Sequence, residues 1–160
     1  MFKFDKLVFG DLGWGDELLL ATLMTITVSI LSMGLGLCLA IVTVWAKLIT
    51  NRIARLIANF YTTVVRGVPE LLVIYLIFFG GNSIVMSVAK LFGYNGYIEL
   101  NALTIGTIAI AFISATYSSE VIRAAYLSVN KGQVEAAKAL GLSKFQILLR
   151  VMGPQIIRFA

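Results

Sequence analysis

The sequence predicts an all-α integral membrane protein, and three observations lead to this fold class. Hydrophobic residues make up 59% of the 160 residues and charged residues 13%, which is about half the charged share of soluble domains. The mean hydropathy is +0.93. The segment 18–46 contains no charged side chain, and about 20 apolar residues are enough to cross a bilayer.

The predicted elements follow from this pattern in chain order. The segment 18–46 is the first span. A second span is predicted over 53–79, because its C-terminal part is fully apolar. The mixed polarity of 83–92 predicts a short interfacial helix followed by a glycine-rich turn. The charge-free run that opens 102–123 predicts the third span, and the residues from Val151 onward are typical of the start of a fourth.

The distribution of basic residues predicts the orientation. Ten Lys and Arg side chains fall on one side of the predicted spans: Lys47, Arg52, Arg55, Arg66, Arg123, Lys131, Lys138, Lys144, Arg150 and Arg158. The N-terminal tail, 1–17, carries four acidic residues and two basic ones. Because cytoplasmic loops carry an excess of Lys and Arg, the tail is predicted to lie outside and the region 130–150 inside. The net charge of +5 is therefore interpreted as membrane topology and not as nucleic-acid binding.

The composition excludes several kinds of site. There is no histidine, and Cys38 is the single cysteine, so the usual zinc-ligand sets and Cys/His catalytic pairs are absent. The sequence also lacks the phosphate loop GxxxxGK[ST] of many ATPases. No catalytic or metal-binding residue is therefore predicted. The chain ends at Ala160, just as the fourth span begins, which predicts the N-terminal part of a longer protein.

Small and hydroxyl side chains recur on one face of two predicted spans. In the first span the set is Thr22, Thr25, Ser29, Ser32, Gly36 and Ala40, and in the third it is Thr107, Ala111, Ala115 and Ser119. Small residues every four positions let helices approach closely in lipid. The pattern predicts helix packing, with a polar lining for a pathway as the alternative, and it implies neighbouring helices from an oligomer.

Charged residues inside the second predicted span are candidates for a substrate pathway. Arg66, Pro69 and Glu70 precede its apolar half, and charges within a membrane are costly unless they have a function. Proline also frees a backbone carbonyl one turn earlier. In the structural alternative, Arg66 reaches the cytoplasmic headgroups and Glu70 pairs with it. Tyr117 and Glu120, toward the inner end of the third span, are candidates of the same kind.

The polar region 130–150 reads as two short capped helices. Asn130 with Gln133, and Ser143 with Gln146, each fit a capping box. Gly141 follows the first helix and can adopt the left-handed conformation that ends it. Helices of about two turns are not stable alone. The first helix must therefore dock, either on its own membrane domain or in a groove of a cytoplasmic partner.

The spacing in this region resembles the EAA motif of ABC-importer permeases. The matching positions are Gly132, Glu135, Ala136, Ala137, Gly141 and Pro154, with Val151 in place of the usual Ile and Gly153 in place of Leu. The segments YTTVVRGVPELLVIYLIFFGG and SSEVIRAAYLSVNKGQVEAAKALG resemble polar amino-acid permeases. Together they look most like the Q-type subunit of histidine, lysine/arginine/ornithine and octopine importers.

This resemblance implies a type I ABC-importer permease fold with three spans, a coupling helix and the start of a fourth span. It implies a bacterial inner-membrane, multi-pass subunit with a periplasmic N-terminus. The implied partners are a second permease subunit (M-type, or a second copy), two ATPase subunits that bind ATP and Mg²⁺, and a periplasmic amino-acid-binding protein. Glu135 is implied as a polar contact with the ATPase and Gly141 as the turn that sets the helix angle. No cofactor is expected on this chain.

The expected substrate is a polar amino acid, in particular a basic one, or an opine. In that case Arg66 is a candidate for meeting a carboxylate, and Glu70 or Glu120 for meeting a basic side chain. Three alternatives stay open: an importer for another small substrate such as glutamate or glutamine, a secondary transporter without an ATPase, and a membrane anchor.

Overall fold

A computed structural model describes residues 13–94, 96 and 101–159 as a set of helices. Residues 1–12 of the predicted tail, and most of the expected glycine-rich turn, lie outside the described residues. The elements in chain order are α1 (Gly15–Leu48), α2 (Arg52–Gly67), α3 (Glu70–Leu91), α4 (Ala102–Ser128), α5 (Lys131–Ala139), α6 (Lys144–Ile147), the π-helix η2 (Leu148–Met152) and α7 (Gly153–Phe159). The described residues contain no strand, so the all-α prediction is confirmed.

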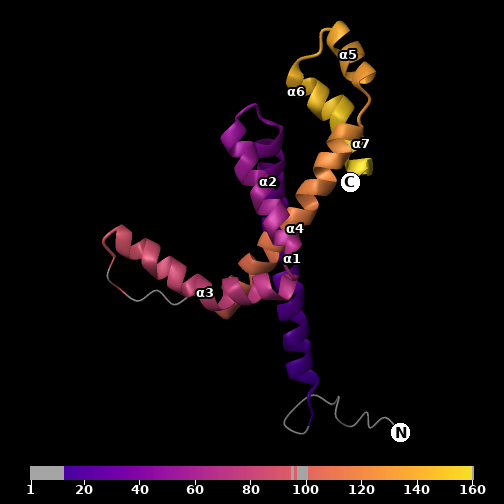
Figure 1. Ribbon diagram of the computed structural model, residues 1–160. Coiled ribbons are helices and arrows are strands. Elements are labelled where there is room, and N and C mark those ends of the chain that lie inside the picture. Colours follow the sequence, from indigo (N-terminus) through magenta and orange to yellow (C-terminus); the bar gives the residue numbers. More distant parts are fainter. Residues whose placement is uncertain (1–12, 95, 97–100, 160) are drawn as a thin grey trace.

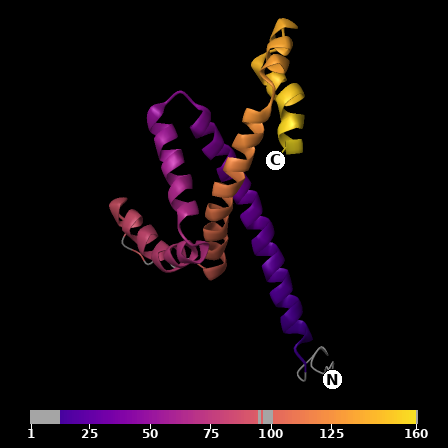
Figure 2. The same ribbon diagram turned by 45° about the vertical axis from the view of Figure 1, so that its right-hand side comes forward.

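Helix α1 is the longest element and forms the axis of the molecule. Its 34 residues extend about 50 Å at 1.5 Å per residue. Helix α4 crosses and packs along its second half, while α2 folds back beside both (Figures 1 and 2). Helix α3 extends sideways from this body in both views. Among the described residues, three helices, α1, α3 and α4, are long and apolar enough to span a membrane.

The second predicted span, 53–79, is corrected by the structure. The chain forms two helices there, and the break falls at Val68 and Pro69. Val68 is extended, with φ −111° and ψ 144°, because the proline ring disfavours a helical conformation in the preceding residue. Pro69 lacks an N–H and opens α3, in which its carbonyl accepts from Leu72 N at 2.9 Å. The apolar span of this region is therefore α3 and not 53–79.

The short interfacial helix expected over 83–92 is also corrected. Helix α3 continues through Gly80 and Gly81 to Leu91 without a break. A glycine inside a helix costs only about 1 kcal/mol, and the apolar residues on both sides favour continuation. Gly93, with φ +82°, then ends the helix. The other bounds are close to prediction: α1 contains 18–46, and α4 extends the predicted 102–123 to Ser128.

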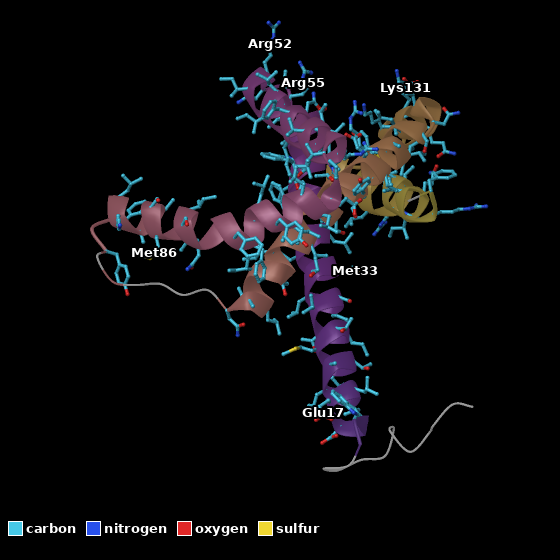
Figure 3. All side chains as sticks on the ribbon, turned by 60° about the horizontal axis from the view of Figure 1, so that its bottom comes forward. Glu17, Met33, Arg52, Arg55, Met86 and Lys131 are labelled. Atoms are coloured by element: carbon cyan, nitrogen blue, oxygen red, sulfur yellow. The ribbon has the colours of Figure 1, made fainter. Side chains whose placement is uncertain are left out.

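Basic residues collect at one end of the molecule. Figure 3 shows Arg52, Arg55 and Lys131 at this end, with Glu17 at the opposite end of α1. The short helices α5 and α6 lie at the same end as the basic residues (Figure 1). We call it the basic end. These labelled charges are therefore separated along α1, in the direction that the positive-inside rule predicts for a spanning protein.

Candidate functional site

The small-residue faces of α1 and α4 pack against each other. Ser32, Gly36 and Ala40 are buried, and Ser32 Oγ donates to the carbonyl of Thr107 at 3.3 Å. A Cβ atom added at Gly36 would lie 3.2 Å from the carbonyl oxygen of Ala111, so glycine is what permits this approach. The packing interpretation is confirmed for the inner half of α1. The outer residues Thr22, Thr25 and Ser29 are instead exposed, and each donates to a carbonyl four residues earlier.

The same face of α1 ends in a buried charge. Lys47 is 6% exposed, and its ammonium group donates to Thr62 Oγ1 of α2 at 2.6 Å. It also forms an ion pair with the Glu120 carboxylate of α4. Arg123 Nη1 lies 3.7 Å from the other oxygen of Glu120. These residues, which we call the Lys47–Glu120 cluster, join α1, α2 and α4 near the basic end.

Next to this cluster, a cleft opens at the break between α2 and α3. One part of it, of about 400 Å³, is lined by Thr62, Thr63, Arg66, Gly67, Tyr117 and Glu120. A second part, of about 270 Å³, is lined by Glu70, Ile74, Ile110, Ile113, Ser114, Tyr117 and Ser118. Tyr117 belongs to both parts, so we treat them as one Tyr117 cleft. Its walls are α2, α3 and α4.

Within the Tyr117 cleft, two opposite charges flank one aromatic ring. The Arg66 guanidinium carbon lies 5.4 Å from the centroid of the Tyr117 ring, a cation–π distance. Glu70, at the start of α3, lines the same part of the cleft as Tyr117. Within the part of the chain that the structure describes, the ion pairs involve Lys47, Glu120 and Arg123 only. The structural alternative in which Glu70 pairs with Arg66 is therefore wrong for this structure.

The helix–turn–helix at the basic end has the capping expected of it, with one correction. Gly141 has φ +77°, and its N–H donates to the Lys138 carbonyl at 2.9 Å, while Leu142 N–H donates to the Ala137 carbonyl at 3.1 Å. This pair of bonds is a Schellman motif. Ser143 and Gln146 form the complete reciprocal capping box at the start of α6.

The first predicted capping box does not form, although Asn130 does cap α5. Asn130 caps α5, but its side chain accepts from Gly132 N at 2.8 Å and not from residue 133. Gln133 does not reach back to the cap. Its side-chain oxygen instead accepts from Gln155 Nε2 at 2.6 Å, so this side chain connects α5 to α7.

Helix α5 docks on its own chain and leaves the opposite face open. Ala137 is 4% exposed, whereas Glu135 and Ala136 are exposed. Leu140, three residues after Ala137, is 81% exposed, because the chain turns away at Gly141. The sequence left own-chain and partner docking open as alternatives. In the structure Ala137 packs against the chain itself, and Ala136 stays exposed and available to a partner.

Two further motif positions, Gly153 and Pro154, lie where α6 continues through η2 into α7. Pro154 has no N–H to donate, and in a regular α-helix its ring would clash with the carbonyl oxygen four residues earlier. The helix accommodates this with η2, in which Gly153 N–H donates to Leu148 O, five residues back. A Cβ atom at Gly153 would lie 3.0 Å from that oxygen. Glycine at 153, where the resemblance has leucine, therefore fits the π-helix.

The structure brings four of the five pathway candidates together. Arg66, Glu70, Tyr117 and Glu120 line the Tyr117 cleft, while Pro69 makes the helix break beside it. Sequence reasoning missed Lys47, which it treated only as a basic loop residue. The burial of Lys47 could have been predicted, because Lys47 continues the three- and four-residue spacing of the buried positions 32, 36, 40 and 43 along α1. Among the described residues, no group of His, Cys, Asp and Glu could hold a metal ion.

Within the described part of the chain, three apolar helices long enough to span a bilayer and a capped helix at the basic end are typical of a membrane-embedded protein. The chain belongs to the family of binding-protein-dependent transport system inner membrane components, whose model matches residues 32–160.

Individual relatives agree with this assignment. The chain is 47% identical over 155 residues to a nopaline transport system permease protein of Agrobacterium fabrum, covering 96% of this chain and 66% of the relative. It is 34% identical to a histidine/lysine/arginine/ornithine transport system permease protein of Escherichia coli, covering 92% of this chain and 64% of the relative. These relatives confirm the resemblance to Q-type polar amino-acid permeases. The chain spans about two thirds of their length.

A solved structure confirms the fold class. The crystal structure of an amino acid ABC transporter with histidines matches with a TM-score of 0.65 and 30% identity, covering 84% of this chain and 57% of that one. The helices described above therefore have the arrangement of an ABC-transporter membrane domain.

Proposed function

We propose that the chain is a transmembrane subunit of an ATP-driven importer for polar amino acids or opines, with basic amino acids as the expected substrates. Its family and its similarity to permease proteins of nopaline and basic amino-acid systems support this proposal. The chain itself is not the enzyme: ATP and Mg²⁺ bind to separate ATPase subunits, and no cofactor binds here.

The observation that carries the proposal is the open face of α5 at the basic end. Glu135 and Ala136 are exposed there, and Leu140 and Phe145 are 81% and 69% exposed. Beside Glu135 a groove of about 320 Å³ opens between α5 and the end of α4. An acidic side chain among small and apolar ones suits a partner surface with a matching groove, which we assign to the ATPase.

The remaining partners and the orientation follow from the same proposal. A second permease subunit, of the M type or a second copy, completes the membrane domain, and a periplasmic amino-acid-binding protein delivers the substrate. The exposed apolar side chains of α1 and α3 are compatible with contact with lipid or with that second subunit. The chain lies in the bacterial inner membrane with its N-terminus in the periplasm and α5 in the cytoplasm, in agreement with the charge separation along α1 (Figure 3).

A charge reversal tests the ATPase contact. Glu135→Arg is expected to reduce co-purification of the ATPase with the membrane complex, because it reverses the one acidic side chain of the open face. Glu17→Arg is the matched control, since Glu17 is exposed at the opposite end of α1. Equal recovery of the ATPase with both variants would contradict the proposed docking face.

Uptake by proteoliposomes tests the transport function. The complete complex with its binding protein is expected to import labelled arginine or histidine only when ATP is present with the ATPase subunits. Import driven by an ion gradient without ATP would instead indicate a secondary transporter.

A further inference from the structure

Two exposed tryptophans lie at the two ends of α1. Trp14 is the N-cap residue and Trp45 lies in the last turn, and both side chains are exposed. At 1.5 Å per residue the helix rises about 46 Å from one to the other, and a bilayer with its headgroup layers is about 40–45 Å thick. Because tryptophan is enriched at both membrane–water interfaces, the pair indicates that α1 ends at the headgroup level. Helix α2 begins at Arg52, directly after the turn that follows α1, and therefore at the same level.

Helix α2 has an exposed apolar face beside its buried one. The helix packs against α1 and α4, and its buried side chains are Ala58, Thr62 and Val65. The exposed apolar side chains are Ile53, Leu56, Ile57, Phe60 and Val64. Since α2 folds back beside α1 (Figures 1 and 2), this face runs from the headgroup level into the apolar layer of the membrane. It is open there to an acyl chain.

Arg52 and Arg55 form a positively charged pair at the headgroup end of this face. They are three residues apart, so their side chains are neighbours on the helix surface, and Figure 3 shows both at the outer end of α2. Both are exposed, so folding does not require a counter-charge for them. Helix α2 contains no acidic residue, and within the described residues neither arginine forms an ion pair. The pair is therefore free to bind an anion from outside the chain.

We propose that α2 is the docking surface for an anionic phospholipid, whose phosphate meets Arg52 and Arg55 and whose acyl chain lies along Leu56 and Phe60. Guanidinium groups match phosphate oxygens through paired hydrogen bonds. Leu56 and Phe60 follow Arg52 by four and eight residues, so they continue from the charged pair along one side of the helix. The order of charge and apolar surface on α2 is thus the order of headgroup and acyl chain in the lipid. This inference goes beyond the importer function and does not depend on the transported substrate.

Two lipids that differ in headgroup charge test the docking surface. The assembled complex in detergent is titrated with dioleoylphosphatidylglycerol, which is anionic, and separately with dioleoylphosphatidylcholine, which is zwitterionic. Native mass spectrometry measures the lipid-bound fractions, and the wild-type complex is expected to bind the anionic lipid more tightly. Each basic residue near an anionic lipid contributes about fivefold in affinity. Arg52→Gln and Arg55→Gln are therefore each expected to weaken phosphatidylglycerol binding about fivefold, and the double variant about 25-fold, with phosphatidylcholine binding unchanged.

The matched control is Lys90→Gln, because it removes an exposed positive charge from the last turn of α3 and not from α2. It is expected to leave the affinity for both lipids unchanged. Leu56→Ser tests the acyl-chain contact and is expected to weaken the binding of both lipids by the same factor, since their chains are identical. If the double arginine variant does not assemble, the two single variants decide the same question.

Three outcomes would overturn the lipid assignment. The first is equal affinity of the wild-type complex for the two lipids, as expected if another subunit covers α2. The second is an equal loss of phosphatidylglycerol binding in Arg52→Gln and Lys90→Gln. The third is displacement of phosphatidylglycerol by an equal concentration of sn-glycerol 3-phosphate, which carries the phosphate without acyl chains and would show a site for a free anion. These measurements use neither ATP nor a transported substrate, so their failure leaves the proposed importer function unaffected.

Discussion

The Lys47–Glu120 cluster predicts an unequal response to the loss of its two partners. The side chain of Lys47 is 2% exposed, whereas that of Glu120 is 28% exposed. Glu120→Gln leaves a buried ammonium group that has only neutral acceptors, Thr62 Oγ1 and the new amide oxygen, and breaking a buried ion pair in this way costs about 3–5 kcal/mol. Lys47→Met leaves a carboxylate that still faces Arg123 at 3.7 Å and reaches solvent. The expected cost is about 1–3 kcal/mol, that of a buried group which loses one partner.

The free energy of unfolding in mixed micelles, followed by tryptophan fluorescence during detergent titration, measures both effects. Arg55→Met is the control, because Arg55 is an exposed basic residue at the same end of the molecule. The double variant Lys47→Met/Glu120→Met is expected to recover most of the loss, since it leaves no buried charge. The reasoning is refuted if Glu120→Gln is no less stable than Arg55→Met, or if Lys47→Met is the more destabilised single variant.

Three further substitutions test other parts of the fold. Gly36→Leu is expected to lower the thermal stability of the detergent-solubilised complex by about 1–3 kcal/mol. Gly34→Leu is the control and is expected to leave the melting temperature unchanged, because a Cβ atom at Gly34 meets nothing within 4 Å. Equal effects of the two variants would contradict the close approach of α1 and α4. Gly141→Ala places a Cβ atom on a backbone with φ +77°, which costs about 1–2 kcal/mol. Substrate-stimulated ATPase activity is therefore expected to fall, and Gly141→Asn is expected to retain more of it than Gly141→Ala. Unchanged activity in Gly141→Ala would show that the turn does not transmit the signal. Tyr61→Phe removes a 2.5 Å hydrogen bond to a backbone carbonyl of α4 and is expected to lower the stability by about 1 kcal/mol in the same melting assay. Tyr75→Phe is the control, because the Tyr75 side chain is half exposed, and it is expected to leave the stability unchanged.

The sequence predicts the strongly patterned parts of this fold well. The charge-free run of α1 and the small residues of α4 determine both a helix and its packing face, since one side of each helix has no bulk. The Schellman turn at Gly141 is equally readable, because few residues other than glycine adopt a positive φ. In each case a local rule and the global structure agree.

The sequence was a weaker guide where two signals compete in one segment. Over 53–79 the apolar content favours one span, and Pro69 favours two helices; the proline prevails because its effect on the preceding residue is steric. Lys47 was misread because the excess of basic residues in loops is a statistical rule, whereas its burial depends on Glu120, 73 residues away. The Tyr117 cleft likewise depends on where α3 leaves the body, which no local pattern specifies.

The π-helix η2 gives the junction between α6 and α7 an extra residue in its turn. An α-helix turns by about 100° per residue. The five-residue π turn could shift to a neighbouring position along the helix. Each side chain between the old and new positions would then rotate by about 100°, and each backbone hydrogen bond that breaks would be replaced by a new one. The side chains of α7, including the one that contacts α5, are therefore attached to the basic end through a joint that can change their direction without unfolding either helix.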